Sequence, residues 1–185
     1  LNRNDPASFT DNTYHVVTDD PGSDETAILD GFTVTGGGGV FYPTQPQLGG
    51  GGFWLINSRA TIRNCTISNH FVAGGSPFEA GPGAPGAGAY IAGGGPTFFQ
   101  CTFVGNGAGN GIPSGCRTGS PYPGDRYGGS GGAVYSDASE PRFIACSFLN
   151  NTAGTGGPST MCLSNGTGGG SGGSGGAVYA SAGRL

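Results

Sequence analysis

The chain has 185 residues, of which 42 are glycine and 13 proline, and its 11 acidic and seven basic residues give a formal net charge of −4. The glycines gather in runs such as 36–39, 49–52 and 168–176, so they lack the three-residue period of collagen. The chain has no basic cluster for nucleic acid and no apolar run near the roughly 20 residues that span a bilayer. Between the glycine runs lie short blocks rich in Ile, Val, Phe, Tyr and Thr, which favour strands over disorder.

The N-terminal part is predicted to be a polar loop over residues 1–13, a short strand over 14–18 and an acidic turn over 19–25. Asp19, Asp20 and Asp24 in this turn are weak candidates for calcium, which binds carboxylate oxygens. Their spacing matches no EF-hand or glycine-aspartate repeat, and a solvated turn is the alternative. Apart from this calcium candidate, the sequence predicts no cofactor and no metal.

From residue 26 onward the sequence repeats. The pattern Pro-x-Phe-x-x-Cys-x-Phe-x-x-Asn begins at Pro96 and again at Pro141, and a related version contains Cys65. Its cysteines are 36 residues apart from Cys65 to Cys101 and 45 apart from Cys101 to Cys146. A period of this size indicates a repeat architecture in which each unit packs on its neighbours.

Three apolar positions in each repeat predict three interior rows. The first two are three residues apart and the last two are two apart, so the chain must bend between them to keep facing one core. The bend falls at Gly31, Asn64, Gln100 and Ala145, and Gly and Asn tolerate the left-handed backbone of a tight corner. The predicted rows are Leu29, Ile62, Phe98 and Phe143; Phe32, Cys65, Cys101 and Cys146; and Val34, Ile67, Phe103 and Phe148.

A third strand per repeat is predicted in the Gly-Ala-Val-Tyr block of residues 132–135 and 176–179 and in related blocks after Gly52 and Gly88. Aligning these blocks gives one row of Trp54, Tyr90, Val134 and Val178 and another of Leu55, Ile91, Tyr135 and Tyr179. The sequence leaves open which of the two rows faces the core. Three strands per repeat predict an all-β fold, a parallel β-helix (solenoid) of about four coils formed by residues 1–185 as a single segment.

Long glycine-rich loops are predicted along one edge of this fold. The insertions 36–52, 71–88, 107–132 and 152–176 all follow the cysteine-bearing strand and precede the Gly-Ala-Val-Tyr strand. Loops of this length are usually functional or disordered. Cys116 and Cys162 lie at matching places in two of them, so we expect a disulfide and hence an oxidising, extracytoplasmic compartment. Two unpaired loop thiols are the alternative.

The segments Tyr14-His-Val-Val-Thr18 and Thr26-Ala-Ile-Leu-Asp-Gly-Phe-Thr-Val-Thr-Gly-Gly37, with the cysteine pattern, resemble bacterial right-handed parallel β-helix proteins of the pectin-lyase-like superfamily. The resemblance is nearest to large repeat-rich surface proteins of the planctomycete type and to polymorphic outer membrane proteins. It implies a right-handed β-helix exported to the cell surface. It does not fix an activity, because this fold hosts lyases, hydrolases, adhesins and structural spikes.

The charged residues do not suggest an enzyme. Catalytic members of the superfamily cleave acidic polysaccharides with carboxylate-bound calcium and an arginine base, or with paired aspartates, and such chemistry needs charges that converge. Here Asp30 and Arg63 stand on neighbouring coils and Asp137 and Glu140 share a turn. We therefore expect a non-catalytic, extracellular structural or adhesive β-helix of a cell-surface or filament assembly.

The alternative is a polysaccharide-binding or polysaccharide-cleaving module, whose partners would be surface glycans. Trp54, Tyr90, Tyr122 and Tyr127 are its candidate sugar-stacking platforms. An exposed aromatic row would favour this alternative, and buried aromatics would favour the structural role. In either case the open tips of a β-helix should bind further coils of the same chain or identical molecules.

Overall fold

A computed structural model of the chain describes residues 13–38, 49–72, 74, 82–111, 127–157 and 170–185. These ranges contain thirteen short strands and no helix, so the prediction of an all-β chain is confirmed. No segment of the described ranges is a helix long and apolar enough to cross a membrane. The strands are β1 (Val17–Asp19), β2 (Ile28–Asp30), β3 (Thr33–Thr35), β4 (Phe53–Ile56), β5 (Thr61–Arg63), β6 (Thr66–Ser68), β7 (Ala89–Ala92), β8 (Thr97–Phe99), β9 (Thr102–Val104), β10 (Val134–Asp137), β11 (Arg142–Ile144), β12 (Ser147–Leu149) and β13 (Val178–Ala180).

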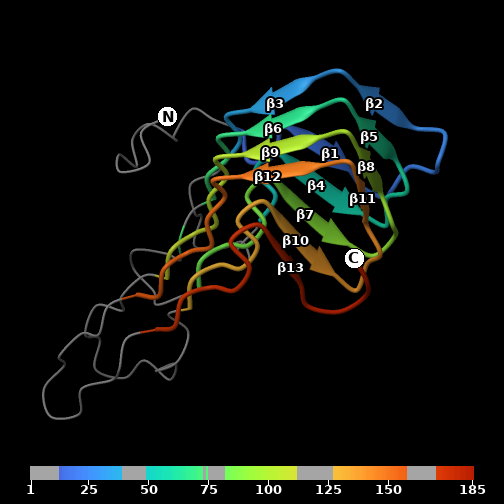
Figure 1. Cartoon of the computed structure of the whole chain (residues 1–185). Helices are drawn as coiled ribbons and strands as arrows, with labels where there is room; N and C mark the ends of the chain where they lie inside the picture. Colours follow the sequence, from blue (N-terminus) through green and yellow to red (C-terminus); the bar gives the residue numbers. More distant parts are fainter. Residues whose placement is uncertain (1–12, 39–48, 73, 75–81, 112–126, 158–169) are drawn as a thin grey trace, which may run out of the picture.

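The strands form three parallel sheets, each of which takes one strand from each repeat (Figure 1). The first sheet has the order β1-β4-β7-β10-β13, the second β2-β5-β8-β11 and the third β3-β6-β9-β12. Each strand therefore pairs with its counterpart in the next repeat, in parallel and in register, as Ile62 does with Phe98 and Ile67 with Phe103. This arrangement is consistent with a parallel β-helix.

Left-handed corners separate the strands of the second and third sheets. At the predicted bend the backbone φ is +79° at Gly31, +53° at Asn64, +52° at Gln100 and +52° at Ala145. One such residue turns the chain within a single position, so the apolar side chains on both sides of it face the same interior. This explains why the apolar spacing changes from three residues to two at this place.

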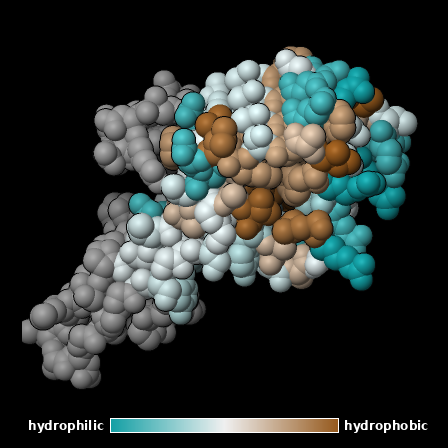
Figure 2. Space-filling view, in the orientation of Figure 1, coloured by the Kyte–Doolittle hydropathy of each residue, from teal (hydrophilic) through white to brown (hydrophobic). Residues whose placement is uncertain are grey.

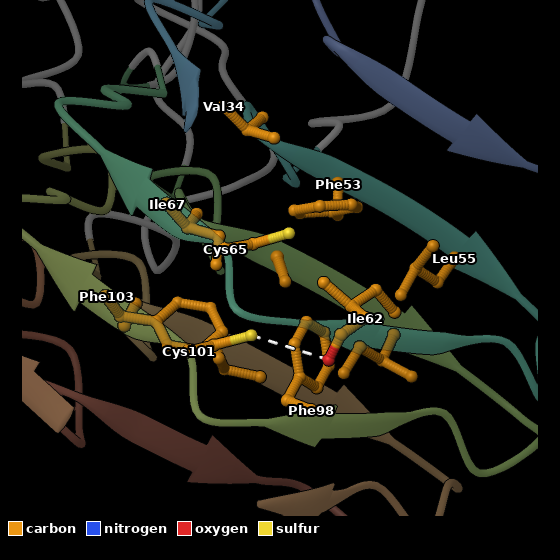
Figure 3. Packing of buried hydrophobic residues seen from close by; sticks show 13 residues of the cluster. Val34, Phe53, Leu55, Ile62, Cys65, Ile67, Phe98, Cys101 and Phe103 are labelled. Atoms are coloured by element: carbon orange, nitrogen blue, oxygen red, sulfur yellow. Dashed lines mark hydrogen bonds between the residues drawn. The ribbon is translucent and has the colours of Figure 1, made fainter. Parts of the chain in front are cut away.

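The interior consists of apolar rows that run from repeat to repeat (Figure 3). Phe98 and Phe103 are fully buried, and their rings stack on those of Phe143 and Phe148 with centroids 5.3 Å and 4.9 Å apart. Leu29, Phe143, Cys146 and Phe148 are only partly buried, because β2 is the last strand of the second sheet at one end and β11 and β12 are the last strands of two sheets at the other. The aromatic and aliphatic rows thus bury one continuous core that no single repeat could bury alone.

Phe32 is the exception among the predicted interior residues. Its counterparts Cys65 and Cys101 are 2% and 1% exposed, whereas Phe32 is 58% exposed. The side chain follows β2 and precedes β3, the outermost strands of their sheets, so no further described strand covers it. Other large apolar side chains are also exposed, among them Ile28, Phe99, Ile144 and Leu149. Figure 2 shows hydrophobic patches, in brown, on one face of the molecule.

Candidate functional site

The outer face of the first sheet carries one aromatic side chain on each of four neighbouring strands. Trp54, Tyr90, Tyr135 and Tyr179 are paired in register from β4 to β13. Their ring centroids are 4.6 Å apart from Trp54 to Tyr90, 5.5 Å from Tyr90 to Tyr135 and 5.5 Å from Tyr135 to Tyr179. His15 adds a fifth ring, 5.0 Å from that of Trp54. These five residues form what we call the aromatic row.

The register corrects the sequence alignment of this strand. Tyr90 pairs with Tyr135 and Ala89 with Val134, one residue away from the predicted match. The outward row is therefore Trp54, Tyr90, Tyr135 and Tyr179, and the inward rows are Phe53, Ala89, Val134 and Val178, and Leu55, Ile91, Ser136 and Ala180. Aligning the repeats on their shared Gly-Ala dipeptide gives the wrong register. The observed register follows when the repeats are aligned on the glycine with positive φ that stands three residues before each strand: Gly50, Gly86, Gly131 and Gly175.

The faces of the rings in the aromatic row are occupied by one another. Trp54 lies between His15 and Tyr90, with interplanar angles of 29° and 11°. Tyr90 lies between Trp54 and Tyr135, and Tyr135 lies between Tyr90 and Tyr179. A sugar stacks on the face of an aromatic ring, and here the described neighbours leave the edges of Trp54, Tyr90 and Tyr135 as their open surface.

Of the remaining predicted sugar platforms, the structure describes Tyr127, which is not part of this row. Tyr127 is 51% exposed and belongs to the glycine-rich segment before β10. Tyr122 lies outside the described residues, as do Cys116 and Cys162, so the predicted disulfide stays a prediction.

His15 stands at the end of the aromatic row and is hydrogen-bonded to the backbone. Its Nδ1 lies 2.8 Å from the carbonyl oxygen of Gly50 and donates to it. Burial lowers the pKa of His15, and this hydrogen bond opposes the shift only in part. The ring therefore packs on Trp54 as an uncharged aromatic group near neutral pH.

The carboxylates of the acidic turn bind neighbouring backbone and hydroxyl groups. Asp19 Oδ1 accepts hydrogen bonds from the backbone amide and the hydroxyl of Ser23, both 2.8 Å long. Asp24 Oδ1 accepts equivalent bonds from Thr26 at 2.9 Å and 2.6 Å. Burial alone would raise the pKa of Asp19, but its hydrogen bonds to Ser58 and Ser23 outweigh that effect and lower it.

The calcium candidates Asp19, Asp20 and Asp24 are not brought together as a metal site. Throughout the part of the chain that the structure describes, no group of three or more His, Cys, Asp or Glu side chains could hold a metal ion. The acidic side chains Asp30 and Glu25 instead pair with arginines of the next repeat, at 2.9 Å to Arg63 and 3.0 Å to Arg59. Both pairs are exposed to solvent and lie on the outside of the second sheet and its preceding turn.

The three cysteines of the repeats are free thiols in the interior. Cys101 Sγ lies 3.4 Å from the carbonyl oxygen of Ile62, and Cys146 Sγ lies 3.4 Å from that of Phe98. Burial raises the pKa of Cys101 to about 11, so this thiol is protonated near neutral pH. A buried, protonated thiol is a poor nucleophile and packs as a small apolar group.

A buried polar row runs beside the third sheet and was not predicted. His70, Asn106 and Asn151 each stand five residues after a row cysteine. Asn106 Oδ1 accepts a hydrogen bond from the His70 backbone amide at 3.1 Å, and Asn151 Oδ1 accepts one from the Asn106 amide at 3.0 Å. The side-chain nitrogens donate to carbonyl oxygens, from Asn106 to Ile67 at 3.0 Å and from Asn151 to Phe103 at 2.9 Å. We call these three residues the polar row.

The glycine-rich segments next to the sheets are hydrogen-bonded to one another through their backbones. One path of amide-to-carbonyl bonds runs from Gly173 to Gly154, from Gly154 to Gly129, from Gly129 to Gly109 and from Gly109 to Ala84, with lengths of 2.8 to 2.9 Å. This set of segments, residues 82–88, 107–111, 127–133, 152–157 and 170–176, is called the glycine bundle below. It extends sideways from the sheets in Figure 1.

Several glycines of the glycine bundle have no space for a side chain. A Cβ atom on Gly154 would lie 1.8 Å from the Gly109 carbonyl oxygen, and one on Gly129 would lie 2.1 Å from that of Ala84. Glycine is therefore required for close approach of the chains, which accounts for much of the unusual composition. The glycine runs are visible in the sequence, but the sequence does not show which glycine-rich segments pack against each other.

Comparison with known proteins adds nothing to this geometry: no family model, no curated protein and no solved structure matches the chain. The features of the molecule that bear on its function are the aromatic row, the polar row and the glycine bundle.

Proposed function

We propose that the chain is a segment of a right-handed parallel β-helix of the pectin-lyase-like kind and that its function is structural rather than catalytic. The observation that carries the proposal is that the apolar, aromatic and polar rows all continue from repeat to repeat along the same direction. Such rows stiffen a rod, because each added repeat extends every row at once.

The charged groups support a non-catalytic role. General acid–base catalysis requires carboxylates or histidines with free access to a substrate. Asp19, Asp24 and Asp30 each accept two hydrogen bonds from groups of the protein itself. His70 is fully buried, and both of its ring nitrogens have backbone partners.

The glycan-binding alternative is disfavoured by the stacking within the aromatic row. Trp54 has a ring packed on each of its faces, so it offers no free face to a sugar. In the structural role the same side chains stabilise the outside of the first sheet, since each stacked aromatic pair adds about 0.5–1.5 kcal/mol beyond its buried area.

The partner that fits this role is another set of strands. Within the described residues, β2 and β3 at one end and β11 and β12 at the other pair on one side only. An unpaired parallel edge recruits further strands. We propose that these edges bind further coils of the same chain or a second molecule, within an extracellular or cell-surface assembly of the kind that the sequence resemblance implies.

The test compares two lysine variants by electron microscopy and analytical ultracentrifugation. Phe148→Lys places a charge in the half-buried interior at the β12 end, and it should abolish end-to-end particles formed by the purified chain. Leu149→Lys is the matched control, because Leu149 is 52% exposed, and it should assemble as the parent does. The proposal is wrong if the parent binds a polysaccharide saturably and Trp54→Ala removes that binding.

A further inference from the structure

Within the aromatic row, two tyrosines lie next to each other on neighbouring strands. Tyr135 of β10 and Tyr179 of β13 are paired in register on the outer face of the first sheet. Their ring centroids are 5.5 Å apart with an interplanar angle of 29°, and both side chains are half-buried rather than sealed in the core. We propose that Tyr135 and Tyr179 form an oxidative cross-linking site, at which a one-electron oxidant of the peroxidase class joins the two rings as dityrosine.

The geometry favours this pair over Tyr90 and Tyr135. Tyr90 is fixed on both faces, by Trp54 at 4.6 Å and by Tyr135 at 5.5 Å. Tyr179 stacks on a single ring among the described residues, and its strand β13 pairs with β10 alone. The Tyr179 ring is inclined by 29° to that of Tyr135, whereas the rings of Tyr90 and Tyr135 are inclined by only 6°.

The cross-linking reaction is a two-electron oxidation, with one electron taken from each tyrosine. Each phenol loses one electron and one proton, the two radicals join through their ortho carbons, and the hydrogen on each of those carbons moves back to its phenolic oxygen. One carbon–carbon bond forms in place of two carbon–hydrogen bonds. The two electrons and two protons reduce one molecule of hydrogen peroxide to two molecules of water at the peroxidase.

The surroundings of the pair suit this chemistry. Both tyrosine side chains are half-buried, so their phenolic protons can leave to solvent. Of the described thiols that would compete for the radical, Cys65 and Cys101 are buried among the interior rows and Cys146 is partly buried against them. A cross-link here would tie β13 to β10 covalently and so reinforce the first sheet.

The experiment treats the full chain with hydrogen peroxide and a haem peroxidase and maps the products by peptide mass spectrometry. We expect an intramolecular peptide pair that contains Tyr135 and Tyr179 and that has lost two hydrogen atoms, together with dityrosine fluorescence. Tyr179→Phe keeps the stacked ring and removes the phenol, so it should abolish this product. Tyr127→Phe is the matched control, because it removes an exposed tyrosine outside the row, and it should leave the product unchanged.

A second measurement separates the site from general tyrosine reactivity. In denaturant, where the register of β10 and β13 is lost, the intramolecular product should disappear while the tyrosines remain oxidisable. The proposal is overturned if the native chain gives only intermolecular or scattered tyrosine products, or if the Tyr135–Tyr179 product survives unfolding at the native yield.

Discussion

His70 and Asn106 occupy the same position in consecutive repeats, and the Asn106 side-chain oxygen accepts a hydrogen bond of 3.1 Å from the His70 backbone amide. The His70 ring does the same for the repeat before it, because its Nδ1 accepts from the Gly37 amide at 3.0 Å. Histidine thus replaces asparagine at one step of the polar row. It also donates as asparagine does, from Nε2 to the Val34 carbonyl at 3.0 Å.

Removing the Asn106 side chain should destabilise the fold strongly. Asn106 is fully buried, and Asn106→Ala would leave the His70 amide without its acceptor and would remove the side-chain hydrogen bond to the Ile67 carbonyl. The unpaired amide costs about 1–3 kcal/mol and the lost hydrogen bond to the carbonyl about 0.5–1.5 kcal/mol, so we expect a loss of about 2–4 kcal/mol in the free energy of unfolding measured by urea titration. Asn110→Ala is the control, because Asn110 is exposed and accepts one hydrogen bond, from Thr155; an equal loss in both variants would contradict this role of the polar row.

Acid should weaken the fold through His70. Burial lowers the pKa of His70 from 6.5 to about 4, against the opposing effect of its hydrogen bonds to Val34 and Gly37. The unfolded chain therefore binds the proton first, and stability is complete above about pH 6.5 and is lost as the pH falls towards 4. The shift corresponds to about 3 kcal/mol.

The check is the free energy of unfolding as a function of pH in the parent and in His70→Asn. Asparagine can make both hydrogen bonds of the polar row without titrating, so the variant should lose most of the slope between pH 4 and 6.5. His15 contributes in the same direction, because burial lowers its pKa too, and His15→Phe removes that share. An unchanged slope in the double variant would show that other groups cause the acid sensitivity.

The sequence correctly predicted a tight corner in each repeat, because a bend in the chain is the simple geometric cause of a change in apolar spacing. It failed at Phe32, whose neighbours in the alignment are cysteines, since a pattern of apolar residues does not reveal which repeat stands at the end of a sheet. It also failed in the register of Tyr90 against Tyr135. There the glycine with positive φ, and not the Gly-Ala dipeptide, fixes the start of the strand.

The polar row and the glycine bundle could not be predicted in the same way. Asn106 and Asn151 were visible as a repeated residue, but His70 in the first of these positions hid the row. For the glycines, the requirement is close approach between segments such as 152–157 and 107–111, which depends on packing between repeats and not on local sequence.

The corner at Ala145 offers a stabilising substitution. Ala145 has a φ of +52°, which costs a residue with a Cβ atom roughly 1–2 kcal/mol, while glycine pays roughly 0.5–1 kcal/mol in chain entropy. Ala145→Gly should therefore raise the free energy of unfolding by about 0.5–1 kcal/mol. Gly31 already fills the equivalent corner of the first repeat. In strand β7, Ala92→Gly should have the opposite effect, and destabilisation by both variants would argue against strain at Ala145.

Two glycines of the glycine bundle test whether close packing explains the composition. A Cβ atom on Gly154 would meet the Gly109 carbonyl oxygen at 1.8 Å, whereas one on Gly172 would meet its nearest neighbour, the Gly154 carbonyl oxygen, at 3.6 Å. Gly154→Ala should force the segments apart, at a cost of about 1–3 kcal/mol or more, and break the hydrogen bonds that Gly154 makes with Gly129 and Gly173.

Hydrogen exchange at individual amides gives the readout for this pair. In Gly154→Ala, the amides of Gly154 and Gly173 should exchange faster, while those of the interior strand β8 keep their protection because β8 pairs with β5 and β11, away from Gly154. Gly172→Ala should leave all of these rates as they are in the parent. Equal protection in the two variants would mean that the segments do not pack at the distance described, and the abundance of glycine would need another cause.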